Sequence, residues 1–215
     1  VGFAVLFTDN TRGAVVAGKG LRVAQDGDSS ILSADGIGEV ARTGVPITEA
    51  RMLSYPDSAT KTVVWTAGGE SFYAISLDGT TIARSTPADY KLMLRYAEFD
   101  PMVSIPRVPF TLGASEARGG ERAYIVQFVT QPLDGDISQI TAAGAKIHIY
   151  LPNYAYLVSM DDRAYAAVSA LPSVRWVGRY EPAYKLEEVL LEQLVSDPSR
   201  MGPTRYNIMA VERGA

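Results

Sequence analysis

Residues 122–186 contain six segments in the order strand, helix, strand, strand, helix, strand, and this order restricts the fold more than any other feature. The first strand is Arg122–Val129 and the last is Val174–Tyr180. Short segments in this order form a four-stranded antiparallel sheet with two helices on one face. We therefore expect the opposite face of the sheet to be open and free to bind a partner.

Local signals place the inner elements of this unit. Asp134 or Asp136 caps the first helix, which Gly144 ends. Asp161 or Asp162 caps the second helix. Alternating residues and the Pro152-Asn153 turn predict two middle strands, Lys146–Leu151 and Tyr154–Met160. These elements together predict a ferredoxin-like βαββαβ unit.

Residues 1–98 are rich in short strand-like segments separated by Gly, Asn and Asp. Gly68-Gly69 predicts a tight turn between two strands, and Asp78-Gly79 predicts another before a strand at residues 80–82. Regular short strands of this kind are typical of a sandwich or small barrel. The chain is thus predicted to be α+β, with an N-terminal sandwich-like domain. The expected strands are Phe3–Phe7, Gly13–Ala17, Leu21–Ala24, Ser30–Leu32, Gly38–Thr43, Thr62–Ala67, Ser71–Leu77 and Tyr90–Tyr96.

The rest of the chain connects or extends these two parts. Residues 99–121 contain three prolines and a glycine-rich stretch, which predicts a linker. Residues 187–203 are expected to form a helix and a second linker, with the helical spacing running over Leu186–Val195. Residues 204–215 repeat the pattern of the first strand of the βαββαβ unit and predict the start of a second such unit.

Composition bounds the function. The net charge of −4 and the sequence pI near 5.1 give no support to a nucleic-acid partner. No apolar run reaches the ~18–20 residues that a membrane-spanning helix needs, so no membrane partner is predicted. The chain has no cysteine, which excludes disulfides and thiolate nucleophiles.

The residues that could carry chemistry have simpler structural roles. His148 is the only histidine and lies in the middle of a predicted strand, where a structural or partner-facing role fits better than catalysis. The paired aspartates could be read as acid–base or calcium sites, but each pair begins a helix, and capping explains them. No catalytic residue, metal site or cofactor is predicted, and the chain is expected to be a binding protein and not an enzyme.

Aromatic residues concentrate in the βαββαβ unit, where they fill a core or contact a partner. The candidate partner-binding residues are Tyr150, Tyr154, Tyr156 and Trp176 on the sheet, followed by Tyr180, Pro182 and Tyr184 on the segment that leaves it. That segment is expected to run extended and to lie along a protease cleft, or to be a simple linker to the next helix.

Several runs carry a resemblance to a known family. They are Phe99-Asp100-Pro101, Tyr124–Phe128, Gly144–Lys146, Tyr150–Val158 and Leu171–Leu186. With these runs, residues 95–215 resemble the N-terminal pro-region of bacterial subtilisin-like serine peptidases. The run Leu171-Pro172-Ser173-Val174-Arg175-Trp176-Val177-Gly178 is the most specific of them.

The resemblance implies a secreted or periplasmic prodomain that helps a peptidase domain to fold and inhibits it until cleavage. The catalytic motifs of that family are missing from the sequence, so the chain is expected to be the N-terminal part of, or a partner to, such a peptidase. A free-standing protease inhibitor and a non-catalytic interaction module remain as alternatives. The sequence does not indicate a role for residues 1–98.

Overall fold

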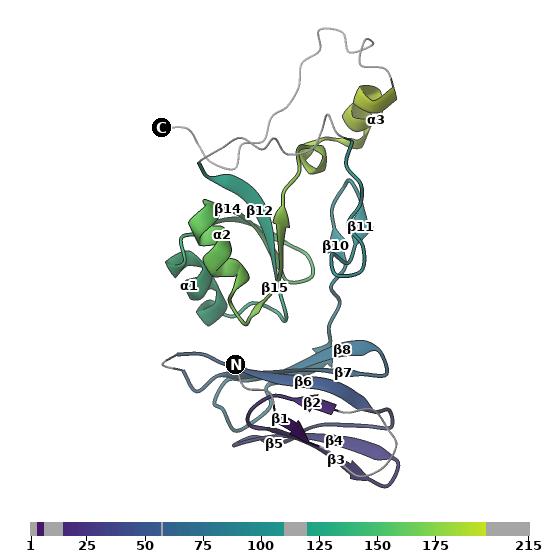
Figure 1. Ribbon diagram of the computed structural model, residues 1–215, viewed down its shortest axis with the longest axis vertical. Coiled ribbons are helices and arrows are strands. Elements are labelled where there is room, and N and C mark those ends of the chain that lie inside the picture. Colours follow the sequence, from purple (N-terminus) through teal and green to yellow (C-terminus); the bar gives the residue numbers. More distant parts are fainter. Residues whose placement is uncertain (1–3, 7–14, 57, 110–119, 197–215) are drawn as a thin grey trace. The chain divides into compact units, whose positions relative to one another are not determined.

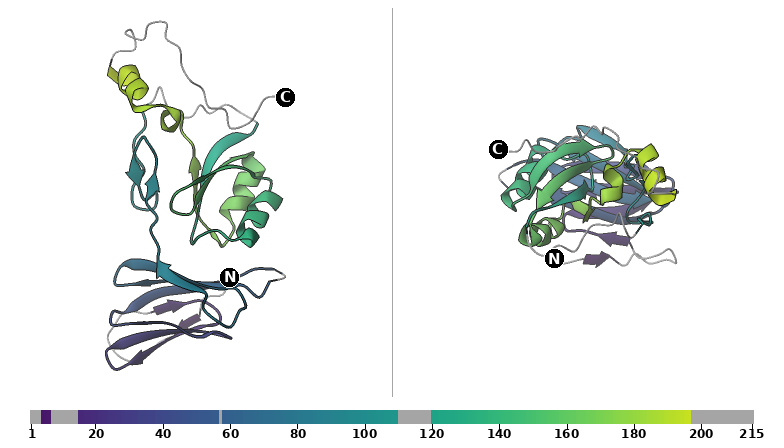
Figure 2. Two further views of the ribbon diagram at one scale, coloured as in Figure 1. Left: turned by 180° about the vertical axis from the view of Figure 1, so that it is seen from behind. Right: turned by 90° about the horizontal axis from the view of Figure 1, so that it is seen from above.

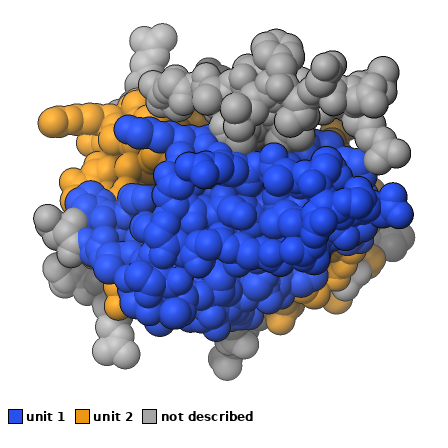
Figure 3. Space-filling model, turned by 90° about the horizontal axis from the view of Figure 1, so that it is seen from below, with its two compact units in different colours: residues 1–89 blue, residues 90–215 orange. Residues whose placement is uncertain are grey.

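The computed structural model describes residues 4–6, 15–56, 58–109 and 120–196 and divides into two compact units, Val1–Asp89 and Tyr90–Ala215 (Figures 1 and 3). Both units are built mostly on antiparallel sheets, and the few helices found among the described residues lie in the second unit, so the α+β class is confirmed. The division falls after Asp89, whereas the sequence predicts it after residue 98. The difference arises because the segment after Asp89 packs against the second unit.

Unit 1 contains two sheets. The smaller sheet is a three-stranded meander in which each strand pairs with the next. The larger sheet has the order β1-β2-β6-β7-β8-β9, and all its pairs are antiparallel except β2 with β6. The small sheet consists of β3 (Leu21–Asp26), β4 (Ser29–Ala34) and β5 (Gly38–Thr43), and the large one of β1 (Ala4–Leu6), β2 (Val15–Ala17), β6 (Ile47–Ser54), β7 (Lys61–Ala67), β8 (Glu70–Ser76) and β9 (Arg84–Pro87).

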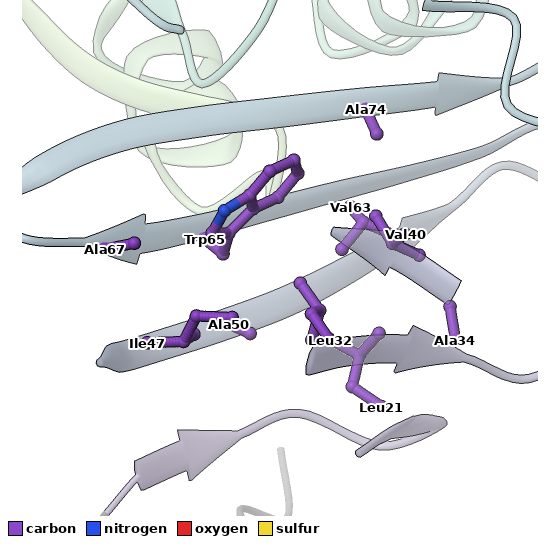
Figure 4. Close-up of a cluster of buried hydrophobic side chains, with 10 residues drawn as sticks. All are labelled: Leu21, Leu32, Ala34, Val40, Ile47, Ala50, Val63, Trp65, Ala67 and Ala74. Carbon is purple, nitrogen blue, oxygen red and sulfur yellow. The ribbon is translucent and has the colours of Figure 1, made fainter. Parts of the chain in front are cut away.

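Buried residues from both sheets of unit 1 form one apolar cluster (Figure 4). Leu32 of the small sheet and Val63 of the large sheet are fully buried within it. Trp65 also lies in the cluster and stacks on Phe72, with ring centroids 5.7 Å apart. Two sheets that share one layer of side chains give unit 1 its core.

The sequence places one hairpin of unit 1 correctly and another incorrectly. Gly68 and Gly69 both have positive φ and join β7 to β8 as a two-residue turn, as predicted. The predicted tight turn at Asp78-Gly79 is wrong, because β8 pairs with Arg84–Pro87 and not with residues 80–82. The Asp78 carboxylate instead accepts the amide hydrogens of Thr80 and Thr81, each at 2.8 Å, which holds the intervening residues in a wider loop.

Strand β6 was missing from the sequence prediction although it is eight residues long. Its buried positions are Ile47, Ala50 and Leu53, so they recur every three residues and not every two. A register shift between Ile47 and Glu49 accounts for the first interval, because a β-bulge adds one residue to a strand. Ala50 and Leu53 lie in a regular part of the ladder, so they are buried on opposite faces, and the strand shows no simple alternation from which it could be predicted.

Unit 2 contains the predicted six-element order. The strand order of its main sheet is β13-β14-β12-β15, and every pair in it is antiparallel. Leu92 pairs with Phe99 in a separate two-stranded hairpin. The elements are β10 (Leu92–Met93), β11 (Glu98–Phe99), β12 (Arg122–Phe128), α1 (Asp134–Ala142), β13 (Lys146–Leu151), β14 (Ala155–Met160), α2 (Asp162–Ser169), β15 (Val174–Arg179), the 3₁₀ helix η2 (Pro182–Lys185) and α3 (Glu188–Ser196).

The two helices of the βαββαβ order begin with different caps. Asp161 is the N-cap of α2, and its Oδ1 accepts the amide hydrogen of Ala164 at 2.7 Å, as the sequence predicts. Helix α1 is capped at Leu133, not at Asp134 or Asp136. Asp136 contributes from the first turn, because its carboxylate accepts the amide hydrogen of Leu133 at 2.8 Å.

Helices α1 and α2 cover one face of the main sheet, and the β10–β11 hairpin lies on the other side (Figures 1 and 2). The helix side has its own core, centred on residues such as Val126, Ile140 and Val168. On the opposite side, Leu92 and Phe99 of the hairpin pack in one cluster with Ile125 and other residues. The prediction of a bare face is therefore wrong for the middle of the sheet, because the chain folds its own preceding segment over it.

Some predictions lie outside the described residues. The proposed second unit at residues 204–215 is one of them, and residues 110–119 of the predicted linker are another. Residues 99–109 of that linker are described, and Phe99 and Val108 belong to the cluster on the sheet. No helix within the described residues is long and apolar enough to span a bilayer.

Candidate interaction site

The seven predicted partner-binding residues do not share one surface. Tyr156 lies on the helix side, where its ring packs edge-on to that of Phe128 with centroids 6.3 Å apart. Tyr150 stands opposite Tyr156 in the strand register, and their ring centroids are 5.2 Å apart. Because residues directly opposite each other share a face, neither tyrosine belongs to the face opposite the helices.

Tyr154 occupies the turn between β13 and β14, so the predicted strand start at this residue is wrong. Both Asn153 and Tyr154 have positive φ, at 64° and 68°, and β14 begins at Ala155. The Tyr154 ring packs edge-on to that of Tyr90 with centroids 6.1 Å apart. The tyrosine therefore helps to hold the segment that enters unit 2.

Trp176, Tyr180 and Tyr184 do lie together, on the face opposite the helices. The Trp176 indole lies over Gly178, two residues along the same strand, at a place that any Cβ on residue 178 would occupy. The Tyr184 ring packs against those of Tyr96 and Phe99, with centroids 5.4 and 6.4 Å away. The chain's own hairpin thus contacts these aromatics.

The segment that leaves β15 is not extended, which corrects a second expectation. Pro182 begins the 3₁₀ helix η2, where a proline fits because it lacks an amide hydrogen. Within this short helix Ala183 is fully buried and Tyr184 is only 6% exposed. Burial raises the pKa of Tyr184 to about 12 and also raises that of Tyr180. Ala183 and Tyr184 are therefore part of the core, and they offer little accessible surface to the binding cleft of a partner.

A polar network ties the entering segment to the sheet. Arg175 donates to both carboxylate oxygens of Asp100, at 2.7 and 2.9 Å, and to Oε1 of Gln127 at 2.8 Å. Its guanidinium carbon also lies 3.9 Å from the centre of the Tyr90 ring. A bidentate arginine–carboxylate pair of this kind combines the attraction of opposite charges with a fixed geometry. We call these four residues the Arg175 network.

Gln127 is the centre of the Arg175 network. Its side chain is fully buried, and its amide nitrogen donates to the carbonyl oxygens of Tyr90 and Asn153 at 2.9 and 3.1 Å. The Tyr90 hydroxyl donates to the Val129 carbonyl oxygen at 2.7 Å. A buried polar group stabilises a fold only when it is hydrogen-bonded, and here the bonds connect three separate stretches of chain.

A β-bulge aims Arg175 into the network. In the pairing of β12 with β15, Gln127 stands opposite Trp176 and Phe128 opposite Val174, so Arg175 is the extra residue. A bulge redirects the side chain at that position. The sequence prediction missed the network, although the polar Gln127 within an otherwise apolar strand was a visible signal.

His148 lies at a second bulge, between Ile147 and Ile149 of β13. Its Nε2 is 2.7 Å from the hydroxyl oxygen of Ser159 on the neighbouring strand. This pair links the edge strand to the sheet where the ladder is irregular. Across the described ranges of the chain, no group of three or more His, Cys, Asp or Glu side chains is arranged to hold a metal ion.

Hydrogen bonds to Asp100 hold the backbone of the turn that follows it, while the side chains of that turn are exposed. Oδ1 of Asp100 accepts the amide hydrogen of Met102 at 2.9 Å, and the Asp100 carbonyl accepts those of Val103 and Ser104 at 3.0 and 2.9 Å. The side chains of Met102, Val103 and Ile105 nevertheless face solvent. No local sequence signal separates these residues from the rest of the predicted linker.

The fold and this site define a class of protein. It is an α+β chain of two units, in which the four-stranded sheet of unit 2 carries two helices on one face and the β10–β11 hairpin on the other. Residues 93–181 match a family described as "Domain of unknown function (DUF8729)". The match begins inside β10 and ends just after β15, so it includes the hairpin and the sheet that the hairpin covers. No curated protein matches the chain.

Proposed function

We propose that this chain is the pro-region of a secreted subtilisin-like serine peptidase, acting as an intramolecular chaperone and inhibitor and having no catalytic activity of its own. In this proposal unit 2 is a ferredoxin-like prodomain unit, unit 1 is a sandwich-like domain, and the chain functions outside the cytoplasm. The partner is a peptidase domain in the same precursor or on a separate chain.

The observation that carries the proposal is the structure of the run Leu171–Leu186, whose first part, Leu171–Gly178, bears the most specific resemblance. This run forms β15, turns at η2 and buries Ala183 and Tyr184 beneath the sheet. Gly178 makes room for the Trp176 indole, so the Trp-Val-Gly spacing has a packing reason. The element order and the order of the strands around this run support a prodomain-like unit.

The contact surface differs from the one that the sequence suggests. The middle of the sheet is filled by the hairpin cluster, so a peptidase would contact exposed surfaces outside that cluster, among them the edge strand β13. Ile149 and Tyr150 are exposed there, with 40% and 50% of their surface accessible. Exposed apolar side chains on a sheet edge are suited to pairing with another chain.

A second function, a non-catalytic interaction module without a peptidase partner, is favoured by one observation. The hairpin residues Leu92 and Phe99 are buried against Ile125 and Ala155, which leaves no bare central face to dock on. A free-standing inhibitor would use the same surfaces as the pro-region.

The test is to titrate the full chain against a broad-specificity bacterial subtilisin with a fluorogenic peptide substrate. Inhibition at or below micromolar concentration is expected. An unrelated protein at the same concentration is the control, because any protein that the subtilisin digests competes with the fluorogenic peptide. In parallel, acid-denatured subtilisin is diluted into neutral buffer with and without the chain, and recovered activity should be higher with it. Unchanged turnover and unchanged recovery at micromolar chain would reject the proposal and leave the interaction module.

A further inference from the structure

The segment from Met102 to Ile105 presents apolar side chains to solvent. Val103 is 82% exposed, Met102 63% and Ile105 54%, and Ser104 between them is also exposed. Single exposed apolar residues are ordinary, but adjacent ones on one short segment indicate a contact surface. None of these three side chains belongs to the cluster that the same segment forms with the sheet.

This exposed segment is fixed at both ends. Upstream, Asp100 binds the turn amides and is held by Arg175, whose side chain is only 16% exposed. Downstream, the Tyr96 hydroxyl donates to the Arg107 carbonyl oxygen at 2.7 Å, and Val108 packs into the hairpin cluster. The loop of residues 102–107 is therefore fixed to unit 2 at both of its ends.

The backbone between the anchors is stiff and irregular. Residues 104–109 form neither helix nor strand. Pro106 and Pro109 each fix their own φ and bias the residue before them, Ile105 and Val108, toward extended backbone. An extended segment outside any sheet can lie along a binding cleft and place its side chains in pockets. This applies to residues 105–108, because the amides of Met102, Val103 and Ser104 are already bound to Asp100.

We propose that the segment 102–108 binds in the substrate cleft of the partner peptidase, with Ile105 entering an apolar pocket and the turn residues Met102 and Val103 packing against the wall of the cleft. This inference rests on the proposed function and assigns its binding element. The 3₁₀ helix and the burial of Tyr184 leave the segment after β15 poorly suited to that task. Anchoring at both ends lowers the entropy lost on binding, which favours tight association.

The test compares inhibition constants of the full chain carrying Val103→Asp or Ile105→Asp with that of the unchanged chain, against the same bacterial subtilisin. The matched control is Val189→Asp, since Val189 is 63% exposed but lies on α3. Because these side chains face solvent, all three variants should fold, and circular dichroism with a thermal melt checks this. We expect at least a tenfold weakening for Val103→Asp and Ile105→Asp and less than a twofold change for Val189→Asp.

The outcomes separate the two proposals. If the unchanged chain inhibits and the two loop variants inhibit equally well, the loop assignment is overturned while the inhibitor function stands. If the unchanged chain neither inhibits nor assists refolding, the function fails and the loop assignment fails with it. Equal weakening by the Val189→Asp control would also overturn the assignment, because the effect would then follow from added charge alone.

Discussion

The Arg175 network should contribute strongly to the stability of unit 2, and Arg175→Met tests this. Methionine keeps most of the aliphatic stem but removes the charge and all donors. The substitution leaves the Asp100 carboxylate, 26% exposed, without its cation, and leaves Oε1 of buried Gln127 without the donor at 2.8 Å. The Tyr90 ring also loses the guanidinium that lies 3.9 Å from its centre.

The magnitude follows from these contacts. Removing one partner of a buried ion pair costs about 3–5 kcal/mol. Because Asp100 is partly accessible, water replaces some of the lost interaction, and we reduce this to about 2–3 kcal/mol. Loss of the contact with the Tyr90 ring adds roughly 0.5–1 kcal/mol. The free energy of unfolding of unit 2 should therefore fall by about 2.5–4 kcal/mol.

The assay is urea denaturation followed by tryptophan fluorescence in a Trp65→Phe background. The chain has two tryptophans, so Trp176 then reports on unit 2 alone. Hydrogen exchange read by mass spectrometry locates the effect. Amides of β10 and β11 should lose protection before those of β14, because the network ties the entering segment to the sheet.

Lys146→Met is the matched control within unit 2. Lys146 also pairs with a carboxylate, that of Glu121 at 3.0 Å, but its side chain is 57% exposed, so its loss should have little effect. A double-mutant cycle with Asp100→Asn should give a coupling on the order of 1 kcal/mol or more. The reasoning is refuted if Arg175→Met shifts the midpoint no more than Lys146→Met, or if the Asp100 and Arg175 substitutions are additive.

Three further predictions follow from local geometry. Gly178→Ala should displace the Trp176 indole, shift its emission to the red and destabilise unit 2 by about 1–3 kcal/mol in urea, since a Cβ there collides with the ring; an unshifted spectrum would contradict the packing. Asp161→Ala removes the cap bond to the Ala164 amide and should cost about 1 kcal/mol by the same denaturation, whereas Asp161→Asn should recover most of it. Burial raises the pKa of Tyr184 from 10.0 to about 12, so the unfolded chain ionises first and stability should fall as the pH rises from 10 to 12. Tyr184→Phe should flatten unfolding midpoints over that window, and an unchanged slope would show that other groups cause it.

Much of the secondary structure could be predicted because local rules govern it. Polar and apolar residues alternate along Lys146–Leu151, which predicts β13, and Asp161 supplies the α2 cap from its own side chain. The two-glycine turn between β7 and β8 was also predictable from local rules. A two-residue turn of this kind needs positive φ, and glycine adopts positive φ without strain. Strand β6 was missed because a bulge interrupts its first positions and because its later buried residues lie on both faces, so its sequence shows no regular alternation.

The tertiary structure decided which surfaces exist. No local rule indicates that the segment after Asp89 folds across the sheet, since its contacts with Ile125 and Tyr184 join residues distant in sequence. The same holds for Arg175, which a bulge turns toward Asp100, 75 positions away. The sequence alone determined the elements and their order, because hydrophobic period, caps and turns act over a few residues. Long-range packing alone determined that the predicted docking face is occupied and that residues 102–105 are presented to solvent, because burial depends on what the rest of the chain covers.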